Sequence, residues 1–450
     1  MNIKNEISFR NISINPFKVI KNANFRKNIF NSFYYFGGTF IQFLIAVFTQ
    51  PIFSRYLELN DFAIIGYYGA IQAILYSLFN MSLPFYYLAK YWKIENGESP
   101  EQNLSFILNF LNISNSIVAI ISFIIIGIYF KSFNVTFPLM PFILIVIGQL
   151  FLEKYKTYYL IECRIKKKGL RFFLINIAQI ILNTIFSLFF VISLKSGAAG
   201  KMSGTLLGVG LTSILALIIL IKEKKYIISF KIDKIKIKSA LIYCIPLIIG
   251  SYAYYPIGNI DRLFLERLGN TMEYGYYSIG LTISGFVGTF FLALYQSFEP
   301  DLYKFISQKR YNHYLLFIIL FLFIISIITL FFILLSTPIV SFLTSGRFVK
   351  ATKYANVFII GILFMQIGGI FEQLFTAYGA TKMAMWRNIM MGIFCIIIYY
   401  FMIQQYQFQG ANITRVITSV FYVVSGAILF FIYYKKKRLM NNRKLIVHNE

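Results

Sequence analysis

The chain has 450 residues, of which 58% are hydrophobic and only 13% are Asp, Glu, Lys or Arg. An average soluble domain has about 25% charged residues, so this composition excludes a soluble enzyme and a disordered chain. The net charge of +26 would suit a nucleic-acid-binding protein, but here the basic residues lie between long apolar runs. The composition therefore predicts an all-α, polytopic membrane protein that does not bind nucleic acid.

Cysteine and histidine are too few for metal or disulfide chemistry. Cys163, Cys244 and Cys395 are scattered along the chain, and His313 and His448 are the two histidines. A disulfide framework or a zinc site needs several such residues at short, regular spacings. We therefore expect no metal site and no cofactor.

Long apolar runs follow one another along the whole chain. A helix needs about 20 mainly apolar residues to cross a bilayer. Twelve runs meet this length, at 28–50, 62–88, 104–130, 137–161, 170–194, 203–221, 239–262, 274–298, 314–336, 351–378, 384–404 and 412–434. The sequence thus predicts twelve transmembrane helices.

The domain organisation follows from grouping these runs by six. We expect a first six-helix bundle at 28–221 and a second at 239–434, joined by a basic linker at 222–238. Residues 1–27 and 435–450 would form basic arms at the two ends. Short loops between the runs leave no room for a separate catalytic domain.

The distribution of basic residues predicts the orientation, because cytoplasmic loops are enriched in Lys and Arg. With a cytoplasmic amino terminus, most of the 43 basic residues fall on the cytoplasmic side. An even number of helices also places both termini in the cytoplasm. The basic clusters are expected to contact anionic lipid head groups. The residues left on the opposite side are Arg55, Lys131, Lys195, Lys201, Arg262, Arg267, Arg347, Lys350, Lys353 and Arg415.

A weak internal repeat relates the two predicted bundles. A shift of about 212 residues places Arg55 on Arg267 and Asp61 on Glu273. Two halves with six helices each are parallel, so they are related by an axis along the membrane normal. Such an arrangement predicts a central cavity between the bundles.

Charged residues within or beside the apolar runs are the candidate functional residues. A charge at the bilayer centre costs about 2.5–3.5 kcal/mol on insertion scales, so such a group is expected to face a cavity or a partner. A buried carboxylate such as Glu372 could couple transport to protons, whereas interfacial caps and snorkelling side chains are the ordinary alternative. The candidates are Arg55, Arg262 and Arg387 for binding an anionic substrate, and Asp61, Asp261 and Glu372 for coupling or gating.

Two stretches resemble the Wzx-type polysaccharide flippases of the MOP superfamily. Residues 51–57, with the sequence PIFSRYL, and the following Asp61-Phe62-Ala63 resemble the opening motif of that family. Residues 259–265, with the sequence NIDRLFL, and Gly275-Tyr276-Tyr277-Ser278 resemble its second-half motif. The pattern of twelve spans in two halves extends this resemblance over the whole chain.

The resemblance implies a transporter of the bacterial inner membrane, not an enzyme. Its substrate would be an undecaprenyl-pyrophosphate-linked oligosaccharide, moved outward by alternating access for O-antigen or another surface polysaccharide. Arg55 and Arg262 match motif positions and would bind the diphosphate, with Arg387 as a further candidate. The polymerase and the chain-length regulator of the same pathway would be partners.

Two alternative functions are open at this stage. A multidrug or cation exporter of the same superfamily would favour acidic cavity residues, which are scarce here, with 17 Asp and Glu in the chain. A membrane polysaccharide polymerase would be expected to carry a long outer loop, and the predicted outer loops are short. Turnover driven by ATP is disfavoured, because residues 197–202 lack the glycine and Ser/Thr positions of a phosphate-binding loop.

Overall fold

The structure is a computed structural model that describes residues 23–91, 99–229, 233–308, 310–378 and 380–447. All regular elements in these ranges are helices, which confirms the predicted all-α class. The first half of the chain contains α2 (Ala23–Tyr56), α3 (Leu59–Asn80), α4 (Leu83–Tyr91), α5 (Pro100–Phe133), α6 (Phe142–Ile165), α7 (Gly169–Leu188), η1 (Phe189–Ser193) and α8 (Gly197–Lys222). The second half contains α9 (Lys234–Glu266), α10 (Thr271–Ser307), α11 (Tyr311–Leu334), α12 (Ser336–Leu343), η2 (Val349–Ala351), α13 (Thr352–Ala377) and α14 (Thr381–Val447).

The helices supply the twelve predicted spans. Ten helical segments of the described ranges are long and apolar enough to cross a membrane. The 67-residue α14 is divided at Gln407, whose φ of 50° and ψ of −129° break the helix, so it provides two spans. The 24-residue α6 is long enough to cross but carries Glu153, Lys154 and Lys156. Counting α6 and both parts of α14 gives twelve.

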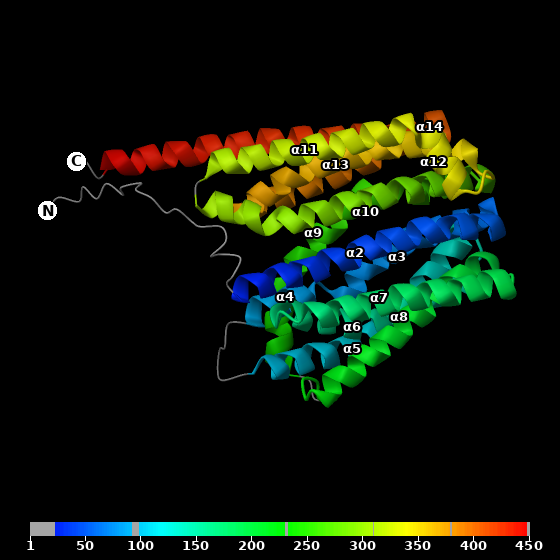
Figure 1. The fold of residues 1–450 in the computed structure, drawn as a ribbon, viewed down its shortest axis with the longest axis horizontal. Coiled ribbons are helices and arrows are strands. Elements are labelled where there is room, and N and C mark those ends of the chain that lie inside the picture. Colours follow the sequence, from blue (N-terminus) through cyan, green and yellow to red (C-terminus); the bar gives the residue numbers. More distant parts are fainter. Residues whose placement is uncertain (1–22, 92–98, 230–232, 309, 379, 448–450) are drawn as a thin grey trace.

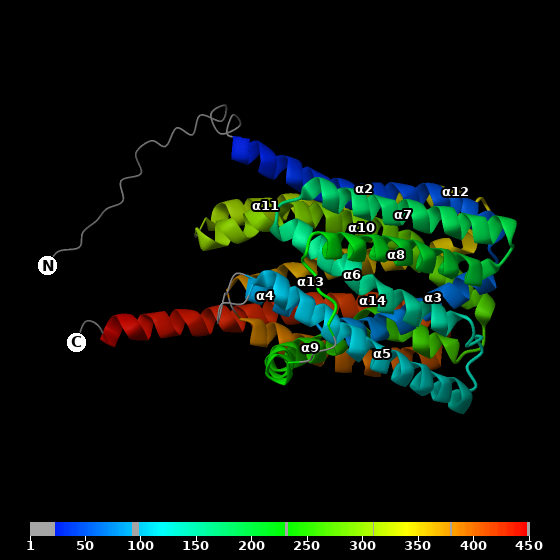
Figure 2. The same ribbon diagram turned by 90° about the horizontal axis from the view of Figure 1, so that it is seen from below.

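The two halves of the chain lie side by side. In Figure 1 the blue to green helices α2–α8 form the lower bundle, and the yellow to red helices α10–α14 form the upper one. The remaining helix, α9, packs against α3 of the first half and α14 of the second. Both views show that α2 begins and α14 ends at the same end of the bundle (Figures 1 and 2). We call this the near end, and the opposite end the far end.

The predicted domain boundaries fall close to helix ends, but they remain predictions. The linker expected at 222–238 is helical at both of its ends, since α8 ends at Lys222 and α9 begins at Lys234. Most of the expected amino-terminal arm lies outside the described residues. The carboxyl-terminal arm continues α14 as far as Val447.

Local sequence signals set several helix ends. At α5, Ser99 accepts a hydrogen bond from the Gln102 backbone, the Gln102 side chain accepts one from Ser99, and Pro100 occupies the first turn. At α9, the Asp233 carboxylate accepts hydrogen bonds from two backbone N–H groups of the first turn. These caps satisfy donors that the first turn of a helix would otherwise leave unpaired.

Small residues allow helices to approach closely within each half. A Cβ on Gly204 of α8 would lie 2.3 Å from the Ser187 backbone nitrogen of α7. A Cβ on Gly392 of α14 would lie 2.3 Å from the Ala253 carbonyl oxygen of α9. Neither gap admits a methyl group, so both contacts depend on glycine, as is common where helices pack in a membrane. The outer surface carries exposed Ile, Leu and Phe side chains, for example Ile125, Phe323 and Leu330, which suits contact with lipid chains.

Candidate functional site: a cavity between the two halves

A cavity of about 1060 Å³ lies where the two halves meet. Its walls come from α3 and α4 of the first half and from α9, α10, α13 and α14 of the second. It is lined by polar and aromatic side chains among smaller apolar ones. The polar and aromatic lining residues are Ser77, Phe85, Ser251, Tyr254, Tyr255, Asn259, Tyr295, Glu372, Gln373, Lys382, Asn388 and Tyr422.

The cavity lies toward the near end of the bundle. Its lining on α3 and α13 comes from the last turns of helices that run toward the near end, including Ser77 and Gln373. Most of its lining on α14 comes from the first turns after Thr381, where that helix leaves the near end, and Tyr422 adds to it from the second part of α14. The distribution of basic residues predicts that this end is cytoplasmic.

Glu372 and Arg387 form an ion pair at the wall of the cavity. Arg387 is fully buried, and its Nη2 lies 2.5 Å from Oε2 of Glu372, whose side chain is 36% exposed. The Arg387 guanidinium also lies 3.9 Å from the ring centroid of Tyr422, and the Tyr422 hydroxyl donates to Oε2 of Glu372 over 3.3 Å. Glu372 therefore faces the cavity, whereas Arg387 lies behind it and is not presented to the cavity in this conformation.

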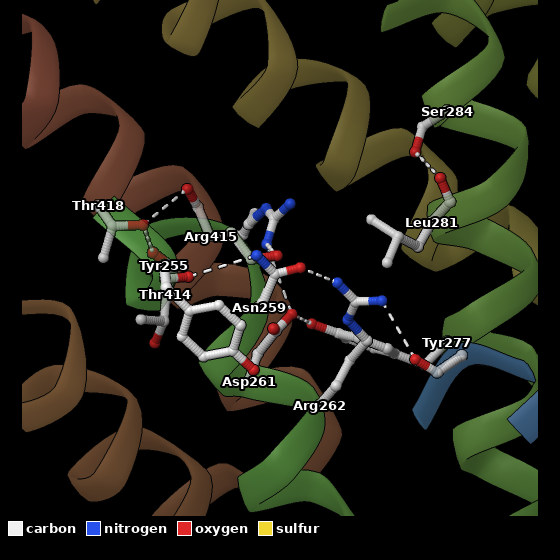
Figure 3. A network of polar contacts seen from close by, with 12 residues as sticks. Tyr255, Asn259, Asp261, Arg262, Tyr277, Leu281, Ser284, Thr414, Arg415 and Thr418 are labelled. Atoms are coloured by element: carbon white, nitrogen blue, oxygen red, sulfur yellow. Dashed lines mark hydrogen bonds and ion pairs between the residues drawn. The ribbon is translucent and has the colours of Figure 1, made fainter. Parts of the chain in front are cut away.

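A second buried ion pair joins α9 to the second part of α14. Asp261 is fully buried, and its Oδ2 accepts a hydrogen bond from the Tyr277 hydroxyl over 2.5 Å. Nη1 of Arg415 lies 3.5 Å from the same oxygen and donates to the Gly258 carbonyl over 2.9 Å. Figure 3 shows the Asp261 carboxylate close to Tyr277 and Arg415, with Arg262 beside it. This pair ties two helices of the second half together.

Arg262 and Arg55 do not line the cavity. Arg262 is half-buried and donates to the Gly66 carbonyl of α3 over 3.1 Å and to the Asn259 side chain (Figure 3). Because Asn259 lines the cavity, Arg262 lies just beyond its deep wall. Arg55 is exposed at the far end, where it borders a second pocket of about 710 Å³ and donates to Oγ of Ser345 over 3.2 Å. The three candidate arginines thus occupy three different places along the bundle.

Asp61 caps helices at the far end. Its Oδ2 accepts from the Glu58 backbone over 2.9 Å, which forms the capping box of α3. Its Oδ1 accepts from the backbone N–H of Ala198 over 2.7 Å, at the start of α8. A carboxylate at two helix amino termini is favoured by the positive ends of the helix dipoles.

Three arginines outside the candidate set lie at contacts between helices. Arg415 is one of the basic residues assigned to the outer side, although it lies within the twelfth apolar run. A charge within an apolar run is the feature that could have marked it as a buried contact. Arg347 donates to the carbonyls of Ser54 and Arg55, over 2.8 and 2.7 Å, at the end of α2. Arg267 donates to the Phe133 carbonyl over 2.8 Å.

The contacts of Arg347 and Arg267 join the two halves at the far end. Glu266 of α9 adds to them, since its Oε1 accepts from both the backbone and the hydroxyl of Thr136, over 2.8 and 2.9 Å. Ser345 adds another, because its hydroxyl donates to the Pro51 carbonyl over 3.0 Å. The molecule is therefore joined by polar contacts at the far end and hollow toward the near end.

A cluster of charges lies at the near end of the first half. Glu223, just beyond α8, pairs with Arg171 and Lys225, and its Oε2 lies 3.9 Å from Nζ of Lys168. Partial burial alone would raise the pKa of Glu223, but the hydrogen bonds from Lys225 and Arg171 outweigh it and lower this pKa to about 2. Within the described residues, no group of three His, Cys, Asp or Glu side chains is placed to hold a metal ion.

The chain is all-helical, with a cavity between its two halves, and it shares this fold with solved membrane transporters. The MatE family model matches residues 246–401, which is the part of the chain that forms most of the cavity wall. Among solved structures, the lipid II flippase MurJ in an inward closed conformation is similar with a TM-score of 0.67 and 17% identity. That match covers 88% of this chain and 86% of the MurJ chain.

Multidrug transporters share the same fold. A mutant of the Vibrio cholerae MATE transporter VcmN is similar with a TM-score of 0.57 and 14% identity, over 92% of this chain and 97% of that chain. An outward-facing multidrug resistance MATE family transporter of the MOP superfamily is similar with a TM-score of 0.56 and 15% identity, over 92% of this chain and 95% of that chain. No match was found among curated proteins. At these identities the similarities establish the fold.

Proposed function

We propose that the chain translocates an undecaprenyl-pyrophosphate-linked oligosaccharide repeat unit across the bacterial inner membrane, for O-antigen or other surface polysaccharide assembly. The observation that carries this proposal is the cavity between the halves. Its volume of about 1060 Å³ is at the upper end of the roughly 300–1,000 Å³ usual for small-molecule sites. Its tyrosines and side-chain amides suit a sugar, and its near-end position suits loading from the cytoplasm.

The arginines would bind the diphosphate in sequence along the bundle. Arg387 lies in the second turn of α14 at the near end, Arg262 lies beyond the deep wall of the cavity, and Arg55 lies at the far end. Arginine suits this role because its planar guanidinium binds phosphate oxygens in bidentate fashion. The diphosphate would first meet Arg387, then Arg262, and leave beside Arg55.

The carboxylates would act as gates that the diphosphate opens. A phosphate that engages Arg387 competes with Glu372, which occupies the same guanidinium in this conformation. Asp261 and Asp61 lie at helix contacts of the second half and of the far end, so changes there would accompany opening toward the outside. With no nucleotide motif in the sequence, an ion gradient would drive turnover.

One observation favours a second candidate function, a cation exporter of the MATE type. Glu372 faces the cavity, and a cavity carboxylate attracts cations. In this structure that carboxylate is already paired with the fully buried Arg387, which weakens its attraction for a cationic substrate. The polymerase alternative receives no comparable support, and we propose a transporter and not an enzyme.

The proposal is tested by removing two arginines in the native bacterial host. The double variant Arg55→Ala/Arg262→Ala should insert normally, lose surface polysaccharide and accumulate lipid-linked single repeats on the cytoplasmic face. Arg310→Ala, at the exposed start of α11, is the matched control and should leave export unchanged.

Each of four outcomes would contradict a part of the proposal. Normal surface polysaccharide in the double variant would exclude the role of these arginines. Single repeats displayed outside a deletion strain would indicate a polymerase, whereas drug sensitivity with normal polysaccharide would indicate an exporter. Reporter fusions at residues 1 and 450 should both report the cytoplasm, and a periplasmic signal from either would reject the orientation.

A further inference from the structure

Gln373 is a buried amide without a partner in the cavity wall. It lies on α13, its side chain is 4% exposed, and it lines the cavity. Within the described residues, neither its Oε1 nor its Nε2 has a hydrogen-bond partner. Buried polar groups in proteins are nearly always paired, so an amide with both atoms unpaired requires an explanation. A ligand in the cavity would supply the missing partners.

Two further residues face the same space. Asn388 of α14 lines the cavity, and its buried Oδ1 also lacks a partner among the described residues. Tyr254 of α9 lines the cavity with 41% of its surface exposed. The wall of one cavity thus contains two amides with unpaired buried atoms and an aromatic side chain. Amides that both donate and accept are complementary to vicinal hydroxyls or an acetamido group, and an aromatic side chain suits the apolar face of a pyranose ring.

The position of these amides relates them to the charged pair. Gln373 directly follows Glu372 in α13, and Asn388 directly follows Arg387 in α14. The unpaired amides therefore lie on the same two helix turns as the Glu372–Arg387 ion pair. A sugar bound by the amides would be close to a phosphate bound at that pair. The first sugar of a lipid-linked repeat unit is close to a phosphate in the same way, because it is attached directly to the diphosphate.

We propose that Gln373 and Asn388 form a subsite for the sugar attached directly to the lipid diphosphate, with Tyr254 against the ring. This inference rests on the proposed function and extends it, because it assigns recognition of the first sugar to named residues. Sites with buried polar groups reject ligands that leave those groups unpaired, so this subsite would discriminate glycosylated from bare lipid diphosphate.

The test compares binding of glycosylated and bare lipid diphosphate to the purified full-length protein. The probes are undecaprenyl diphosphate and the same lipid bearing glucose, galactose, N-acetylglucosamine or N-acetylgalactosamine. The wild-type protein should bind at least one glycosylated probe more tightly than the bare lipid. Gln373→Met, which keeps the length of the side chain and removes its hydrogen bonds, should weaken that binding by about 5- to 150-fold and leave the bare lipid unaffected.

Two control measurements separate recognition from structure. Gln366→Met lies on the same helix outside the cavity lining and should change neither affinity. The midpoint of thermal unfolding should rise in Gln373→Met, because the substitution removes an unpaired buried amide. Asn388→Ala provides a second variant and should also weaken the glycosylated probe selectively.

Several results would overturn the inference. Equal weakening of glycosylated and bare lipid by Gln373→Met would reject a sugar subsite, as would a lower thermal midpoint that shows the amide to be structural. Wild-type protein that binds bare and glycosylated lipid equally would reject it too. Failure of the wild-type protein to bind any lipid diphosphate would instead reject the proposed function itself.

Discussion

Removal of Arg415 should destabilise the second half of the molecule strongly. The guanidinium lies 3.5 Å from the fully buried Asp261 carboxylate. At an effective dielectric constant of about 20, a pair at this distance gains roughly 5 kcal/mol of attraction. Loss of one partner of a buried pair typically destabilises a protein by about 3–5 kcal/mol, because the other charge stays buried. Since Tyr277 still donates to Asp261, we expect Arg415→Met to lower the free energy of unfolding by about 3 kcal/mol, the lower limit of this range.

The double variant Asp261→Asn/Arg415→Met separates electrostatics from packing. It removes both charges together, so it should recover most of the loss, with a coupling energy of about 2–3 kcal/mol. Unfolding of the purified protein in mixed detergent micelles, followed against increasing SDS, gives the free energy of unfolding for each variant. Gly258 loses the same hydrogen bond in both Arg415 variants, so that contribution cancels in the comparison.

Two results would refute the stabilising role of the Asp261–Arg415 ion pair. If Arg415→Met unfolds at the wild-type SDS fraction, the buried charge is compensated in another way. If the double variant is as unstable as the single one, lost packing of the arginine stem explains the defect and the ion pair does not.

Two further predictions concern the near-end charge cluster and the contact of α9 with α14. The pKa of Glu223 is lowered to about 2, so its carboxylate stabilises the fold fully above its ordinary pKa of 4.5, and this contribution is lost as the pH falls toward 2. Glu223→Gln should therefore lower the thermal midpoint at pH 7, and its difference from wild type should shrink steadily from pH 4.5 to 2; a constant difference would contradict this. Gly392→Ala should destabilise the protein by about 1–3 kcal/mol in the SDS assay, because its methyl group meets the Ala253 carbonyl. Gly285→Ala, which meets no atom within 4 Å, should be neutral, and equal effects of both would argue against the contact.

The fold could be predicted from the sequence because apolar run length is a local property. Each of the twelve runs contains a helix long enough to cross the membrane, although the run at 62–88 also includes the break between α3 and α4. The charges of α6 and the break at Gln407 obscure the count as well. The sequence also predicts which end of the bundle is cytoplasmic, because most basic residues fall in the segments on one side of these runs. The observed helix ends differ from the ends of the predicted runs by several residues, because a helix can continue past the apolar segment into the membrane interface.

The candidate site was harder to predict, because its contacts join residues of different helices. The sequence selected Glu372 and Arg387 separately, and the structure places them in one ion pair. It selected Asp61 for coupling or gating, which stays a prediction, and the structure shows that Asp61 also caps a helix, which the spacing of Glu58 and Asp61 at the start of a run could have indicated. The amide of Gln373 carried no sequence signal, because a glutamine in an apolar run does not show whether it has a partner.

In the proposed transport cycle the far end must open, so its contacts bear on the speed of that step. Its contacts are hydrogen bonds from Arg347, Arg267 and Ser345 to backbone carbonyls, with Arg55 exposed beside them. A neutral hydrogen bond such as that of Ser345 contributes about 0.5–1.5 kcal/mol, and one from a charged arginine about 1.5–3 kcal/mol. The same end also holds a buried apolar cluster that spans both halves and includes Phe62 and Phe348, whose rings are in contact. Water can replace the polar bonds one at a time, whereas the apolar cluster has to separate as a unit. The apolar cluster therefore sets the larger part of the barrier to opening this end.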